Sequence, residues 1–404
     1  MRITQNIFNM KRVLIILSTV LLVLACEKMA EVKTVDLAKL SADYEAKNGD
    51  VLSGIMDGNY KITIADGATV TLKNAVVYGV DDRDCKWAGI TLLGDATLVL
   101  EASNIVRGFD AGFPGILVPK GKTLTITGNG KLDASSNGYA PGIGGDDDNG
   151  GNIVIQGGTI RATGGDGAAA IGSIRFRSCG DITISGGSVT AIGGDEGAGI
   201  GSGLEASCGN ITISGGTVIA EGGDSAAGIG CGHLATCGKI SISGGDVTSR
   251  GDVDAAGIGS GSGEDDDEED EEDEEDEEDE DEGNATSICG DITISGGTVT
   301  VHGHSIIAAA AIGSGCNARC GNILISGGTV TAEGGYKSAG IGTSERGSVG
   351  NITITSGVTQ VTAKKWDEKT PHSIGGGVDY VSIGTVTVGG KEGPVSESPF
   401  VYKP

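Results

Sequence analysis

Three aspartates recur at one position of a repeated segment and could coordinate a cation. They are Asp166, Asp195 and Asp224, spaced by 29 residues. Stacked carboxylates repel one another, and Ca²⁺ relieves that repulsion when backbone carbonyls complete its oxygen shell. A second acidic corner consists of Asp146, Asp147 and Asp148. Two interpretations stay open for both corners: Ca²⁺ binding, and screening of exposed carboxylates by solvent.

Five cysteines also share one position of the repeat. They are Cys179, Cys208, Cys237, Cys289 and Cys320. One coil rise would place successive members within the range of a disulfide. The sequence has no CxxC pair, so the spacing does not favour zinc, with Cys316-x3-Cys320 as a weak exception. We predict a buried ladder of free thiols, with one or two disulfides as the main alternative and a metal as the third.

The histidines and arginines form no recognisable catalytic arrangement. None of the four histidines recurs together with a Ser or Cys nucleophile and an acid. A polysaccharide lyase would need an Arg base beside Ca²⁺-binding aspartates, and the arginines stand at different offsets within the repeat. We therefore expect a protein that is not an enzyme.

Four aromatic residues have two expected roles. Tyr139 and Tyr336 fall in loops, where aromatic rings can stack on sugars and contribute to ligand binding. Trp87 and Trp366 fall in the first and last predicted coils, where they are expected to cover the ends of the stack.

The repeat that positions these residues alternates in the manner of β-strands. In the copy that starts at Cys179, Ile182 and Ile184 point to one side, and glycine pairs separate this strand from two further short strands. Isoleucine or valine recurs at three such positions in successive copies. This pattern predicts an all-β chain, a single parallel β-helix of about ten coils with about 29 residues per coil.

Composition excludes several other classes of protein. The chain has 404 residues, 74 of them glycine, and a net charge of −27. Glycine without a three-residue period excludes collagen, and the acidic balance argues against a nucleic-acid partner.

Residues 264–282 are 19 consecutive acids, and the rest of the chain carries a net charge of only −8. We expect this run to be a disordered insertion at one corner, because the flanking repeats keep their register.

The N-terminal sequence indicates export. Residues 13–25 are apolar or small, follow Lys11 and Arg12, and precede Cys26. This pattern is typical of a lipoprotein signal peptide, with lipidation at Cys26; an ordinary cleaved signal is the alternative. We therefore predict a signal peptide at 1–25, a tether at 26–48, the β-helix at 49–390 and a C-terminal tail at 391–404. The predicted location is the outer membrane or cell surface.

Several segments resemble a known family. NGDVLSG (48–54), DGNYKITIADGATVTL (57–72) and KWAGITLLGDATLVLE (86–101), followed by coils of the type CGNITISGGTV, resemble exported glycine-rich β-helix proteins of Bacteroidetes and Firmicutes, often described as carbohydrate-binding domain proteins. The resemblance implies a right-handed parallel β-helix, Ca²⁺ and binding of plant-type or acidic polysaccharides. The acidic insertion departs from the usual pattern of that family.

These observations lead to one functional expectation and two alternatives. We expect a monomeric, lipid-anchored surface β-helix that binds a polysaccharide, with acidic glycans held through bridging Ca²⁺. The first alternative is a structural or adhesive surface protein that binds host or cell-surface protein. The second alternative is a polysaccharide lyase or hydrolase.

Overall fold

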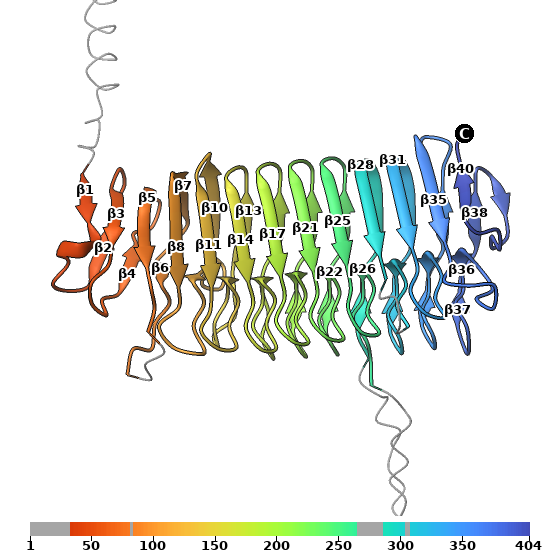
Figure 1. Ribbon diagram of the computed structural model, residues 1–404, viewed down its shortest axis with the longest axis horizontal. Coiled ribbons are helices and arrows are strands. Elements are labelled where there is room, and N and C mark those ends of the chain that lie inside the picture. Colours follow the sequence, from red (N-terminus) through yellow and green to blue (C-terminus); the bar gives the residue numbers. More distant parts are fainter. Residues whose placement is uncertain (1–32, 81–83, 265–285, 304–307) are drawn as a thin grey trace, which may run out of the picture.

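The chain winds into an elongated stack of parallel β-coils (Figure 1). The computed structural model describes residues 33–80, 84–264, 286–303 and 308–404. Among these residues there is no α-helix, and the one helical turn is the 3-10 helix η1 (Leu37–Lys39). The predicted all-β parallel β-helix with about 29 residues per coil is confirmed.

Each regular coil contributes to three sheets. In one coil, β16 (Ile182–Ile184) and β17 (Ser188–Ile192) belong to a 22-stranded sheet, β18 (Ile200–Gly201) to a 12-stranded sheet, and β19 (Ser207–Cys208) to a 6-stranded sheet. The first three of these strands follow the predicted pattern. The fourth, at the cysteine, was not predicted, because two residues are too few to show alternation.

The remaining strands repeat this arrangement. The 22-stranded sheet further contains β1 (Thr34–Asp36), β3 (Val51–Ile55), β5 (Thr69–Val77), β7 (Ala96–Glu101), β8 (Ser103–Arg107), β10 (Thr123–Gly128), β11 (Lys131–Ser135), β13 (Asn152–Ile155), β14 (Thr159–Thr163), β20 (Ile211–Ile213), β21 (Thr217–Glu221), β24 (Ile240–Ile242), β25 (Asp246–Arg250), β28 (Ile292–His302), β31 (Ile323–Glu333), β34 (Ile352–Ile354), β35 (Gln360–Lys364), β38 (Val386–Val388), β39 (Lys391–Glu392) and β40 (Phe400–Tyr402). The 12-stranded sheet further contains β2 (Tyr44–Ala46), β4 (Ile62–Ile64), β6 (Ile90–Leu92), β9 (Ile116–Leu117), β12 (Ile143–Gly144), β15 (Ile171–Gly172), β22 (Ile229–Gly230), β26 (Ile258–Gly259), β29 (Ile312–Gly313), β32 (Ile341–Gly342) and β36 (Ile374–Gly375). The 6-stranded sheet further contains β23 (Thr236–Cys237), β27 (Ile288–Cys289), β30 (Arg319–Cys320), β33 (Ser348–Val349) and β37 (Ser382–Ile383).

Columns of aliphatic side chains fill the interior, as the repeat predicts. Ile182 pairs in register with Ile211, and Ile211 pairs with Ile240. All three side chains are fully buried. A single coil could not bury its inward face alone, so stacking in register is what removes these side chains from water.

The short strands of the 12-stranded sheet require glycine. Gly201 has a φ of +143°, a conformation open to glycine and strained for other residues. A Cβ atom at this position would lie only 1.8 Å from the carbonyl oxygen of Gly230 in the next coil. The Gly-Ile-Gly segments are therefore places of close contact between coils.

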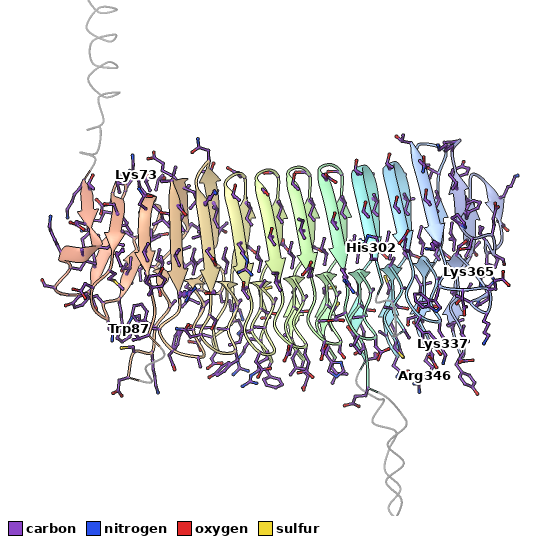
Figure 2. The ribbon with its side chains drawn as sticks, in the orientation of Figure 1. Lys73, Trp87, His302, Lys337, Arg346 and Lys365 are labelled. Carbon is purple, nitrogen blue, oxygen red and sulfur yellow. The ribbon has the colours of Figure 1, made fainter. Side chains whose placement is uncertain are left out.

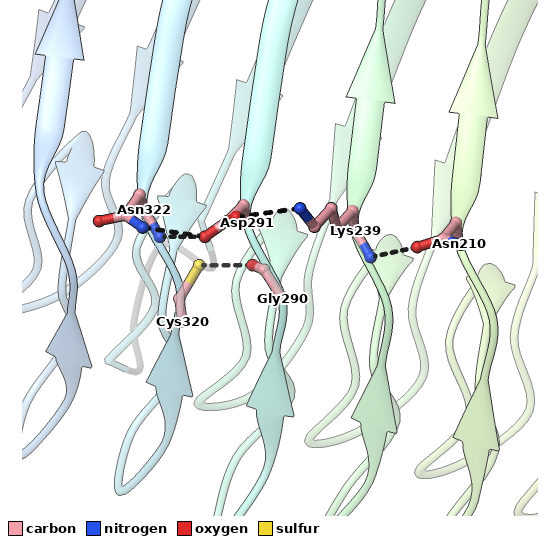
Figure 3. A network of polar contacts seen from close by, with 6 residues as sticks. All are labelled: Asn210, Lys239, Gly290, Asp291, Cys320 and Asn322. Atoms are coloured by element: carbon pink, nitrogen blue, oxygen red, sulfur yellow. Dashed lines mark hydrogen bonds and ion pairs between the residues drawn. The ribbon is translucent and has the colours of Figure 1, made fainter.

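Asparagine and aspartate side chains link successive coils along one corner (Figure 3). The Oδ1 atom of Asn210 accepts a hydrogen bond from the backbone N–H of Lys239 at 3.0 Å, and Asp291 does the same for Asn322 at 2.9 Å. Lys239 offers no such acceptor, and its Nζ atom instead lies 3.5 Å from Oδ2 of Asp291. Side-chain oxygens that accept a backbone N–H of the next coil include those of Asp66, Asp95, Asn152, Asp181, Asn210, Asp291, Asn322 and Asn351.

Both ends of the solenoid differ from the predicted boundaries. β1 pairs with β3 and β2 pairs with β4, so the solenoid begins at Thr34, inside the predicted 26–48 tether. At the other end, β40 pairs with β35 in antiparallel orientation, so residues 391–404 are not a free tail. These strands lie outside the regular repeat, which explains why its periodicity could not find them.

Several predictions fall on residues outside the described part of the chain. These are the signal peptide at 1–25, the lipidation site Cys26, and all of the acidic run except Glu264. The prediction that the insertion leaves the flanking coils in register is confirmed, since Cys237 pairs with Cys289 and Ile258 with Ile312. In the described residues, no helix is long and apolar enough to cross a membrane.

Candidate functional site

The repeated aspartates lie at exposed corners. Asp166, Asp195 and Asp224 are all exposed to solvent. The Nη1 atom of Arg175 lies 3.7 Å from Oδ2 of Asp166, so the chain itself supplies a cation at one end of this column. Solvent and Arg175 together can offset the mutual repulsion of these carboxylates.

The second acidic corner is more enclosed. Burial raises the pKa of Asp146, although the backbone N–H of Asp148 donates to its carboxylate at 3.0 Å. Asp147 and Asp148 are exposed, and Nε of Arg177 donates to the carbonyl oxygen of Asp147 at 2.6 Å. Across the described ranges, the set of three candidate ligand atoms that come within 4.8 Å of one another consists of cysteines, not of these aspartates. Ca²⁺ at either corner therefore stays a prediction.

The two tyrosines singled out in the sequence do not meet at one surface. Tyr139 is half-buried, and the guanidinium of Arg175 lies 4.4 Å from its ring centroid. Tyr336 is 41% exposed, with Nζ of Lys337 at 5.6 Å from its ring centroid. Tyr139 follows β11 and Tyr336 follows β31, so several coils separate them. Each tyrosine is paired with a cation of its own coil or of its neighbour.

The cysteines form the predicted ladder. Cys208 pairs in register with Cys237, Cys237 with Cys289, and Cys289 with Cys320. The five ladder cysteines are buried free thiols, which confirms the thiol interpretation for the ladder. A further residue, Cys231, joins the ladder from a different position of the repeat.

Cys231 has an unusual environment. Its Sγ atom lies within 4.8 Å of those of Cys237 and Cys289. Burial would raise its pKa, but hydrogen bonds from Cys237, Cys289 and Ser287 outweigh that effect and lower the pKa of Cys231 to about 6. The pKa of Cys237 is raised instead, by burial and by its contact with Cys231.

A groove crosses the C-terminal coils on the surface of the 22-stranded sheet. It has a volume of about 310 Å³, and its side chains are Arg250, His302, Glu333, Lys364, Lys365 and Trp366. We call this surface the Trp366 groove. The groove arises from register, because β25, β28, β31 and β35 pair at their last residues: Arg250 with His302, His302 with Glu333, and Glu333 with Lys364. His302 and Lys365 mark it in Figure 2.

Charge and shape make the Trp366 groove suited to an anionic ring. Trp366 is 40% exposed, so part of its ring can contact a ligand. Arg250, Lys364 and Lys365 contribute three positive charges against one negative charge from Glu333, whose Oε2 lies 3.4 Å from Nδ1 of His302. A glycoside hydrolase of the usual kind requires two carboxyl groups, and the groove lining contains one.

The structure does not place either tryptophan at an end of the stack. Trp366 follows β35, and β36, β38 and β40 come after it. Trp87 packs beside Phe109, with ring centroids 5.6 Å apart, and Nζ of Lys61 lies 5.0 Å from its ring centroid. The sequence carries a signal for the groove: Arg250, His302, Glu333 and Lys364 each stand three residues after a recurring valine, which is Val247, Val299, Val330 or Val361.

Comparison with known families supports the architecture. A family model described as "Beta helix repeat" matches seven segments: 124–147, 153–174, 182–204, 211–233, 240–262, 292–316 and 323–345. The chain is similar to that repeat family over these segments, and its described residues form the repeated parallel β-helix. No curated protein and no solved structure matches it. β-Helix repeat proteins include polysaccharide-degrading enzymes and non-enzymes, so the match does not decide between the two.

Proposed function

We propose that this β-helix repeat protein binds an acidic polysaccharide in the Trp366 groove without cleaving it. The observation that carries the proposal is the half-exposed ring of Trp366 beside Arg250, Lys364 and Lys365. Aromatic rings stack on the apolar faces of sugars, and guanidinium and ammonium groups bind carboxylate or sulfate groups. A single groove therefore offers both kinds of contact that a charged sugar requires.

The stack of coils suits a linear polymer. Neighbouring coils are about 4.8 Å apart, so the column from Arg250 to Lys364 presents side chains at regular steps along the solenoid. A polysaccharide that lies along this column can contact several coils at once, and weak contacts then add to a useful affinity. The groove also supplies cations directly, so binding does not require bridging Ca²⁺.

The predicted anchor and location complete the proposal. Lipidation of Cys26 would hold the solenoid at the surface of an outer membrane, where extracellular glycans are accessible. The protein is proposed to act there as a monomer. Ca²⁺ at the aspartate corners is a separate proposal, which the binding experiment also tests.

Calorimetric titration with oligogalacturonate and with a neutral oligosaccharide of equal length tests this function. We expect binding of the acidic ligand in both Ca²⁺ and chelator, and weaker binding at high salt. Trp366→Ala should reduce affinity about three- to ten-fold, the loss of one aromatic stack of roughly 1 kcal/mol. The matched control is Tyr380→Ala, since Tyr380 is 93% exposed and does not line the groove.

Three outcomes would count against the proposal. If Trp366→Ala binds the acidic ligand with the same affinity as wild type, the groove is not the binding site. If neutral and acidic oligosaccharides bind with equal affinity, the three cationic side chains do not select the ligand. Release of unsaturated or reducing products would show a lyase or hydrolase instead.

A further inference from the structure

We propose that Cys231, Cys237 and Cys289 form a three-sulfur site for Cu(I) inside the solenoid. This inference concerns the interior and does not depend on the Trp366 groove. The three Sγ atoms lie within 4.8 Å of one another, and all three residues are buried. Metal–sulfur bonds of about 2.3 Å place the sulfurs of one site about 4 Å apart. Adjustments of less than about 1 Å therefore close the site around an ion.

The fold brings these residues together from two positions of the repeat. Cys237 in β23 and Cys289 in β27 pair in register within the 6-stranded sheet. Cys231 comes directly after β22, at a position where other coils have serine. Those serines are Ser173, Ser202, Ser260 and Ser314.

Three of these four serines, Ser173, Ser202 and Ser260, each accept a backbone hydrogen bond through Oγ, whereas Oγ of Ser314 is buried without a partner. Oγ of Ser202 accepts a hydrogen bond from the N–H of Gly232 at 3.2 Å, and Oγ of Ser260 accepts one from Gly315 at 3.0 Å. The Sγ atom of Cys231 lies instead 3.3 Å from the carbonyl oxygen of Ile288, beside the cysteine ladder. Because Cys231 stands where other coils have serine, a third sulfur lies beside those of Cys237 and Cys289.

Ligand type and number favour Cu(I) over Zn²⁺. Thiolates select soft ions, Cu(I) and Zn²⁺ among them. A structural zinc site requires four ligands, and within the described residues no fourth His, Cys, Asp or Glu belongs to this cluster.

The experiment uses the reduced full-length protein under anaerobic conditions. Cu(I) is titrated in competition with bathocuproine disulfonate, and Zn²⁺ is titrated separately against a chromogenic chelator. We expect one Cu(I) to be retained per chain and Zn²⁺ to be lost. Cys231→Ser should weaken Cu(I) binding at least ten-fold, and it should fold because serine occupies this position in neighbouring coils. The matched control, Cys208→Ser, changes a ladder cysteine outside the cluster and should leave binding unchanged.

X-ray absorption at the copper edge provides a second measurement that needs no variant. Three sulfur neighbours around copper would support the site, and two sulfurs or an oxygen or nitrogen neighbour would overturn it. Failure of the reduced wild type to retain Cu(I) would also overturn it. Equal effects of Cys231→Ser and Cys208→Ser would show binding by the ladder in general and would likewise contradict the proposal.

Discussion

The close approach of coils at Gly201 predicts a large effect of a single methyl group. An alanine Cβ at this position would lie 1.8 Å from the carbonyl oxygen of Gly230, whereas real Cβ contacts are essentially never shorter than 3.0 Å. The two coils would have to separate locally by about 1.2 Å. That movement would break the hydrogen bond from the N–H of Ser202 to Gly230, which is 3.1 Å long.

The magnitude follows from two contributions. Holding alanine at a φ of +143° costs about 1–3 kcal/mol. Each backbone hydrogen bond that is lost between the coils costs about 1 kcal/mol or more, since the groups are buried. We therefore expect Gly201→Ala to reduce the free energy of unfolding by about 2–4 kcal/mol. Gly121→Ala is the matched control, because Gly121 has a φ of +72° with nothing within 4 Å of an added Cβ, so only about 1 kcal/mol is expected.

Denaturant unfolding of the full chain, together with hydrogen exchange of amides in β18 and β22, measures this difference. Hydrogen exchange is needed because a solenoid can open locally, and a single global transition then understates the effect. Local loss of protection in Gly201→Ala with normal protection in Gly121→Ala is the expected result. If the two variants have the same stability and protection, the contact between coils does not restrict this position and the reasoning is wrong.

Two further predictions concern the asparagine and aspartate corner. Asn210→Ala removes the acceptor for the backbone N–H of Lys239 and should lower the free energy of unfolding by about 1 kcal/mol, measured by denaturant titration; an unchanged midpoint would contradict this. The backbone N–H of Asn322 lowers the pKa of Asp291 below its ordinary value of 3.8. A lowered pKa stabilises the fold above that ordinary value, and the contribution is lost as the pH falls through the folded-state pKa. Asp291→Asn keeps the acceptor oxygen at every pH, so its thermal midpoint should fall less steeply with acid than that of wild type.

The repeated part of the fold could be predicted from sequence because each coil supplies the same pattern. Alternating isoleucines identify the inward face, and their recurrence fixes which residues stack. Ile182, Ile211 and Ile240 pair as expected. The prediction did not reach β1 or β40, whose residues pack at the ends and carry no repeat signal.

The candidate sites could be predicted only in part. The cysteine ladder follows from one position of the repeat, so sequence spacing is enough to find it. Cys231 belongs to a different position, and its approach to Cys237 depends on how the chain turns between β22 and β23. Trp366 likewise reaches the groove from a loop whose path the repeat does not determine.

The C-terminal end of the solenoid carries antiparallel segments, which differ from the parallel coils before them. β38 pairs with β39, β35 pairs with β40, and Ile374 of β36 forms an antiparallel bridge with Val395. An open parallel coil would be a template for another copy to add end to end and extend into a fibre. An antiparallel strand spaces its N–H and C=O groups differently, so a further parallel coil cannot continue in register. We therefore expect these antiparallel strands to hinder head-to-tail growth at this end.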